Sequence, residues 1–150
     1  MVSELRHIAI NVSDLNAAEG YYKQLFNMEL IGREAELGDG LWYTLPMDKG
    51  WNDGQAAGIE LGMVALKRGA LVLALFPGNP QPGQLYIVGL NMDLKEIAEV
   101  RERKPEDAEV WEDYSDSLTF RDRYAIIWQI YPTGTIFSSN GESQERWLEV

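Results

Sequence analysis

The hydrophobic pattern at the start of the chain predicts a strand that runs into a helix. Apolar and polar residues alternate over residues 5–12, as in a strand with one buried face. Ser13 or Asp14 then supplies a helix N-cap. Apolar residues next recur every three or four positions over 14–27, which predicts a helix that buries one side. These positions are Leu15, Ala18, Tyr22, Leu25 and Phe26.

The same pattern returns in the second half of the chain. Residues 85–92 again predict a strand, Asp93 a helix N-cap, and Glu96 the partner of that cap in a capping box. The strand beginning at position 9 matches that at position 89, so the offset is 89 − 9 = 80. A hairpin pattern over 63–76 also recurs at 118–131, with an offset of 125 − 70 = 55. Both halves thus show strand, helix, strand and hairpin in the same order, which we interpret as an internal duplication.

The two offsets differ by 80 − 55 = 25, which locates an insertion in the first half at about 36–58. The insertion contains Trp42, Tyr43 and Trp51, and long loops in compact domains are usually functional or disordered. We predict one domain over 1–150, with module one at about 4–77, module two at about 84–131 and a tail at 132–150. A short C-terminal helix with Trp147 and Leu148 is predicted in the tail.

Composition restricts the chemistry more than the fold. The chain has no cysteine, which removes disulfides and thiolate sites, and His7 is its only histidine. A net charge of −11 disfavours nucleic acid and anionic membranes as partners. No apolar run of about 18 residues and no apolar signal core occurs, so we expect a cytoplasmic protein.

The motif His-Ile-Ala-Ile-Asn-Val-Ser-Asp-Leu at 7–15, followed by Tyr-Tyr-Lys-Gln-Leu-Phe-Asn-Met-Glu-Leu at 21–30, resembles the opening module of a known family. This is the vicinal-oxygen-chelate superfamily of glyoxalases, bleomycin resistance proteins and extradiol dioxygenases. The resemblance spans residues 4–131. It implies an α+β fold of two pseudo-repeated βαβββ modules, whose mixed sheets form a curved cup around a substrate pocket, and frequently a homodimer. The second half departs from the family, since Asp122-Arg-Tyr-Ala125 replaces an Asp-Pro-x-Gly turn.

The resemblance also implies where a metal would bind, because family enzymes hold one with inward residues on the first and last strands of each module. The two offsets place His7, Ala74, Ile87 and Gln129 there. His7 is a good ligand and Gln129 a weak one, whereas catalytic zinc sites usually have three protein ligands. We therefore expect no cofactor and no catalytic metal. A register error of one residue would bring in nearby acids, namely Glu60, Asp116 and Asp122.

Three functions stay open. The leading hypothesis is a small-molecule-binding protein with a mostly apolar pocket and a few polar residues. Its predicted ligand-binding residues are His7, Asn11, Trp42, Tyr43, Trp51, Asn91 and Gln129. The second hypothesis is a metal-dependent lyase, isomerase or dioxygenase with a displaced metal site. The third is a structural or interaction module whose cup is filled by side chains. The ligand and any catalytic residues stay unassigned.

Overall fold

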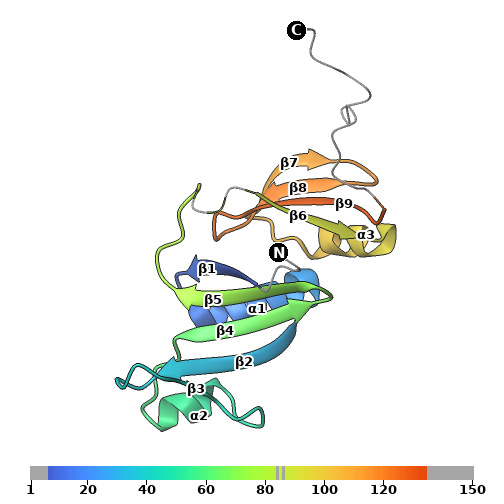
Figure 1. The fold of residues 1–150 in the computed structure, drawn as a ribbon. Helices are drawn as coiled ribbons and strands as arrows, with labels where there is room; N and C mark the ends of the chain where they lie inside the picture. The colour runs from blue at the N-terminus through green and yellow to red at the C-terminus, as the bar shows by residue number, and fades with distance from the viewer. Residues whose placement is uncertain (1–6, 84, 86, 135–150) are drawn as a thin grey trace, which may run out of the picture.

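The computed structural model describes residues 7–83, 85 and 87–134, which form two mixed sheets and three helices (Figure 1). The first module contains β1 (Ile8–Val12), α1 (Leu15–Phe26), β2 (Glu29–Glu36), β3 (Trp42–Thr44), α2 (Trp51–Ala56), β4 (Met63–Arg68) and β5 (Leu71–Pro77). The second module contains β6 (Ile87–Met92), α3 (Leu94–Arg103), β7 (Glu109–Asp113), β8 (Leu118–Arg121) and β9 (Ile127–Pro132). Here the sheet of the first module is called sheet A and that of the second sheet B.

Strand order confirms the duplicated α+β fold. Sheet A has the order β1-β5-β4-β2-β3 and sheet B the order β6-β9-β8-β7. In both sheets the first strand pairs in parallel with the last strand of its module, and the remaining pairs are antiparallel. Ala9 lies opposite Ala74 in sheet A, and Gly89 lies opposite Gln129 in sheet B. The two offsets found in the sequence relate one pair to the other, so the duplication inferred from them is confirmed.

Both predicted helices begin at their predicted caps. Asp14 accepts a 2.9 Å hydrogen bond from the backbone N–H of Ala17, and Asp93 accepts one of 2.8 Å from that of Glu96. Each bond satisfies a donor that the first turn of a helix leaves without an intrahelical partner. The side chain of Glu96 pairs with Arg68 of the other module rather than completing the predicted capping box.

The insertion adds two short elements to the first module. β3 pairs with β2 and becomes the edge strand of sheet A, and α2 follows it after a turn. Arg33 of β2 connects this region to the rest of the module. Its guanidinium makes a bidentate pair with Glu19 of α1, at 2.6 and 2.8 Å, and lies 5.6 Å from the centre of the Trp51 ring.

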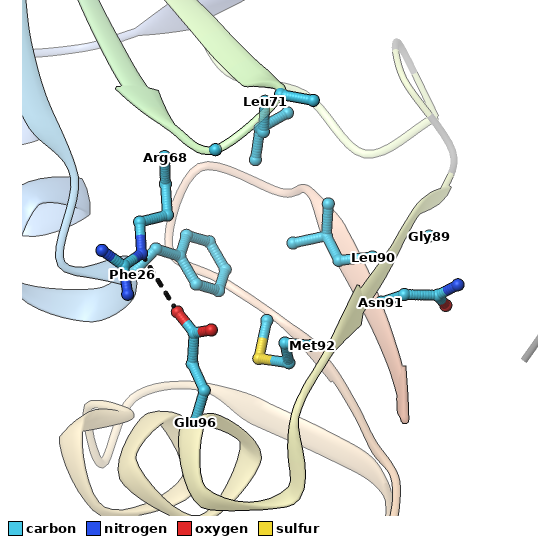
Figure 2. A pocket seen from close by; sticks show the side chains of 10 residues that line it. Phe26, Arg68, Leu71, Gly89, Leu90, Asn91, Met92 and Glu96 are labelled. Carbon is cyan, nitrogen blue, oxygen red and sulfur yellow. Dashed lines mark hydrogen bonds and ion pairs between the residues drawn. The ribbon is translucent and has the colours of Figure 1, made fainter. Parts of the chain in front are cut away.

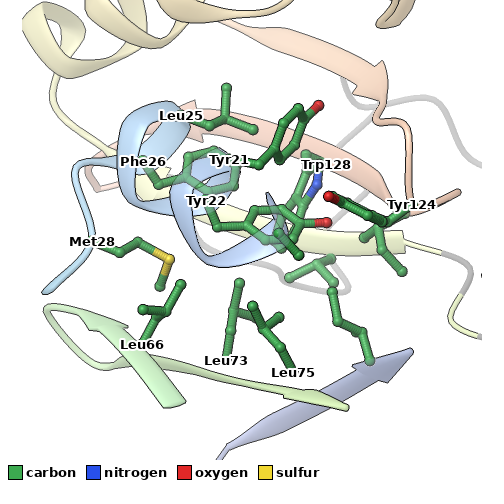
Figure 3. Packing of buried hydrophobic residues seen from close by; sticks show 14 of the residues in the cluster. Tyr21, Tyr22, Leu25, Phe26, Met28, Leu66, Leu73, Leu75, Tyr124 and Trp128 are labelled. Carbon is green, nitrogen blue, oxygen red and sulfur yellow. The ribbon is translucent and has the colours of Figure 1, made fainter. Parts of the chain in front are cut away.

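Helix α1 lies between the two sheets (Figure 3). One side packs on Leu66, Leu73 and Leu75 of sheet A, while the Phe26 ring lies 4.8 Å from that of Trp128 in sheet B. Residues of both modules thereby belong to one hydrophobic cluster. Each sheet turns its helix-covered face toward this shared core, and we call the opposite face of each sheet its open face.

The predicted modules and mixed sheets are therefore present, and their arrangement adds a feature that the pattern did not reveal. The two open faces point away from each other, on either side of the shared core (Figure 1). Among the described residues, no helix is long and apolar enough to cross a membrane. The predicted C-terminal helix with Trp147 and Leu148 lies outside the described residues.

Candidate functional site

The open face of sheet A carries three of the predicted ligand-binding residues. Ile10 and Val12 of β1 are buried in the core, so the alternation of the strand places His7, Ala9 and Asn11 on the opposite side. His7 and Asn11 are exposed there. Trp42 joins them from β3, where it pairs with Glu36 and remains 50% exposed.

Two close contacts shape this face. The six-membered ring of Trp42 lies close to the backbone of Gly62, where an added Cβ would be 3.4 Å from the ring. Trp42 also makes an edge-to-face contact with Phe76, with 6.3 Å between the ring centroids. Phe76 in turn lies opposite Asn11 across the β1–β5 pair. The face thus combines an indole and a phenyl ring with a carboxamide and the imidazole of His7.

The other two aromatic residues of the insertion do not join Trp42 on the open face. Tyr43 lies opposite Ala35, which is buried on the core side, and donates a 2.5 Å hydrogen bond to Asp39. This bond raises the pKa of the Tyr43 hydroxyl. Trp51 packs beneath Arg33 against the core. The three aromatic residues of the insertion, all predicted to bind the ligand, are therefore divided between the two sides of sheet A.

The open face of sheet B carries the remaining two predicted residues. Trp128 and Ile130 are buried in the core, which places Gln129 and Tyr131 on the open side. Asn91 lies opposite Tyr131. Burial, and secondarily the negative charge of Glu112, raises the pKa of the Tyr131 hydroxyl. Sheet B thus offers two carboxamides and a protonated phenol.

The four positions that the family uses for a metal all lie on open faces, but on different sheets. His7 directly precedes β1 of sheet A and Ala74 belongs to β5 of that sheet, whereas Ile87 and Gln129 belong to sheet B. The shared core separates the two pairs within one chain. In the described part of the chain, no group of three or more His, Cys, Asp or Glu side chains could hold a metal ion.

The alternative acidic ligands differ in their availability. Asp122 is 5% exposed, and its two carboxylate oxygens accept four hydrogen bonds. The donors are Tyr22 Oη, Trp128 Nε1 and the backbone N–H groups of Tyr124 and Ile126. Its burial raises the pKa of Asp122, although these hydrogen bonds oppose the shift. Asp122 is thus engaged inside the protein, whereas Glu60 and Asp116 are exposed.

Neither a protein-family model nor a curated protein matches the chain, but solved structures match it over most of its length. The fosfomycin resistance protein FosX from Listeria monocytogenes is 19% identical, with a TM-score of 0.65 over 98% of this chain and 100% of FosX. FosX from Mesorhizobium loti is 15% identical, with a TM-score of 0.64 over 97% and 100% of the two chains. An integron cassette protein from V. cholerae is 14% identical, with a TM-score of 0.53 over 89% and 98%.

The FosX proteins belong to the vicinal-oxygen-chelate superfamily. This chain has the vicinal-oxygen-chelate fold. Identities of 19% and 15% establish the fold and leave the reaction open.

Two further residues on the open face of sheet B, Tyr131 and Glu112, were not predicted from the sequence. The signal for Tyr131 was available, because it lies two positions after Gln129 and a strand places such residues on one face. Glu112 was harder to place, since β7 contains a bulge between Val110 and Glu112 that changes the alternation.

Proposed function

We propose that this protein binds a small molecule as a homodimer, without a catalytic metal. The site would form between the open face of sheet A of one copy and the open face of sheet B of a second copy. The observation that carries the proposal is the orientation of the two open faces. They point away from each other within one chain, so a pocket enclosed by both needs two chains.

The side chains on these faces support small-molecule binding. Ligand pockets are mostly apolar and contain a few polar groups that fix orientation. Sheet A offers Trp42 and Phe76 beside Asn11 and His7. Among the described strands, β1 and β6 each have only one neighbour in their own sheet, so the edges next to both faces can receive a second copy.

Mixing two variants tests the shared site. Trp42→Ala weakens the sheet A face, and Gln129→Ala weakens the sheet B face. Each variant alone should lose binding, because both of its sites contain one weakened face. When equal amounts of the two variants are mixed and their subunits exchange, half of the dimers contain one copy of each variant. One of the two sites in such a dimer is intact, so binding should return to about a quarter of the wild-type capacity.

Calorimetry with fosfomycin and with bleomycin would measure this capacity, and sedimentation would report the oligomeric state. Gln24→Ala, an exposed glutamine on α1, is the matched control and should bind like wild type. Binding that is lost in both variants and does not return on mixing would place the site within one chain. A monomer that neither probe stabilises against heat would instead favour the structural or interaction module.

A metal-dependent enzyme is the second candidate, and His7 on an open face favours it. FosX from Listeria monocytogenes has been crystallised with Mn(II) and sulfate, and a mutant of it with Mn(II) and 1S,2S-dihydroxypropylphosphonic acid. In this chain His7 would be the nitrogen ligand, and Gln129 of a second copy a weak oxygen ligand. Elemental analysis after loading with Mn(II) decides between the candidates. A stoichiometric metal that is lost in His7→Ala would overturn the metal-free proposal.

A further inference from the structure

A cavity opens at one end of the helical layer between the sheets (Figure 2). Its volume is about 460 Å³, within the range of roughly 300–1,000 Å³ that small-molecule sites occupy. The turn between β4 and β5 forms one side, while β6 and the first turn of α3 form the other. The cavity therefore lies between the modules, and at β6 it borders the open face of sheet B through Gly89 and Asn91.

Core-facing apolar side chains line this cavity. Phe26 of α1 and Met92 of β6 are buried, and Leu71 and Leu90 are partly buried against the hydrophobic cluster. Figure 2 shows these four side chains directed toward the same space. An apolar ligand would cover hydrocarbon surface that the two modules leave uncovered, and removing this surface from water favours binding.

One ion pair crosses the cavity between the modules. Arg68 Nε donates to Glu96 Oε1 at 3.2 Å. The Arg68 side chain is 47% exposed and the Glu96 side chain 22%, so an incoming polar group meets the guanidinium first. Among the described residues, the two terminal nitrogens of Arg68 make no hydrogen bond, and a guanidinium presents such nitrogens in a geometry that suits a carboxylate.

We propose that this cavity binds a compact apolar carboxylate. The hydrocarbon part lies against Phe26, Leu71, Leu90 and Met92, and the carboxylate accepts hydrogen bonds from the terminal nitrogens of Arg68. The apolar part and the guanidinium of this site all belong to one chain.

Three probes with the same chain length test both parts of the proposal. Octanoate, octan-1-ol and octylamine differ only in their head group. Octanoate should bind saturably and about two- to fivefold more tightly than octan-1-ol, as expected for a partly exposed ionic contact. Octylamine should bind most weakly. A preference for octylamine would mean that Glu96 selects the head group, and it would overturn the assignment to a carboxylate.

Three variants separate the head group from the apolar part. Arg68→Gln should reduce octanoate affinity to that of octan-1-ol and leave octan-1-ol unchanged. Leu90→Trp fills the cavity and should abolish binding of both, whereas Leu94→Trp, at a 57% exposed position of α3, should bind normally. In the wild type, octanoate should shift the amide NMR signals of Gly69 and Gly89, which line the cavity. Unshifted signals, or undiminished binding by Leu90→Trp, would refute the site.

Discussion

The hydroxyl of Tyr22 donates a 2.5 Å hydrogen bond to Asp122, which joins helix α1 of the first module to the turn between β8 and β9 of the second. Tyr22 is fully buried and Asp122 is 5% exposed. Trp128 Nε1 donates to the same carboxylate oxygen at 2.7 Å. A buried carboxylate with four donors thus fixes the relative position of the modules, and with it the directions of the two open faces.

Removing this hydroxyl should weaken the whole fold. Tyr22→Phe keeps the ring in the core and deletes one donor to a buried carboxylate. Hydrogen bonds to charged groups contribute about 1.5–3 kcal/mol, and we expect the free energy of unfolding to fall by this amount. Urea denaturation measures the change. Tyr114→Phe, at a 62% exposed tyrosine, is the control and should change stability by less than about 0.5 kcal/mol.

The protein should lose stability in alkali. Burial raises the pKa of Tyr21 and Tyr22 above their ordinary value of 10.0. Above about pH 10 the unfolded chain releases these protons while the folded protein retains them, so the free energy of unfolding falls as pH rises. Denaturation at pH 8 to 11 measures this slope, which should be shallower in Tyr22→Phe. Equal slopes in the two proteins would mean that Tyr22 ionises normally in the fold.

The repeated pattern was sufficient to predict the modules because each strand and helix is amphipathic on its own. Two independent offsets then related the positions of Ala9 and Ala74 to those of Gly89 and Gln129, which lie opposite each other in the two sheets. The offsets left open whether Gln129 or Trp128 lies on the open face, and the burial of Trp128 decides for Gln129. These features depend on local periodicity and on pairing within a module, which the order of residues encodes directly.

Features that depend on packing between modules could not be predicted. Asp122 lies in a turn, where an acid usually faces water, and it is buried only because α1 covers it. Trp42 and Trp51 belong to one insertion, yet they lie on opposite sides of sheet A because Trp42 begins β3 and Trp51 begins α2, after the turn that leaves the strand. No periodicity indicated which way the open faces would point.

Breaking the buried pair of Arg33 and Glu19 should destabilise the first module strongly. Their side chains are only 12% and 7% exposed. Removing one partner of a buried pair leaves the other charge uncompensated and costs about 3–5 kcal/mol, so we expect that loss in Glu19→Gln and in Arg33→Met. Urea denaturation should show a much smaller loss for the double variant Glu19→Leu/Arg33→Met. A double variant as unstable as the sum of both singles would contradict this explanation.

Gly78 should resist substitution because of Asn11. The chain leaves β5 at Gly78, whose backbone N–H donates to the carbonyl of Val12. A Cβ added at Gly78 would lie 2.8 Å from Asn11 Oδ1 and 3.0 Å from Asn11 Cβ. The second atom cannot rotate away, so Gly78→Ala should cost about 1–3 kcal/mol, as overpacking does.

A double-mutant cycle isolates that contact. Asn11→Gly removes the Cβ as well as the carboxamide, so Gly78→Ala should cost clearly less in that background than in the wild type, and the difference measures the interaction energy. Gly20→Ala is the control, since a Cβ there meets nothing within 4 Å and alanine stabilises a helix interior by about 0.5–1 kcal/mol. Additive costs at positions 11 and 78 would show that backbone strain, rather than Asn11, makes alanine unfavourable. A measured coupling would instead mean that the same contact holds Asn11 in place on the open face, where a ligand would meet it.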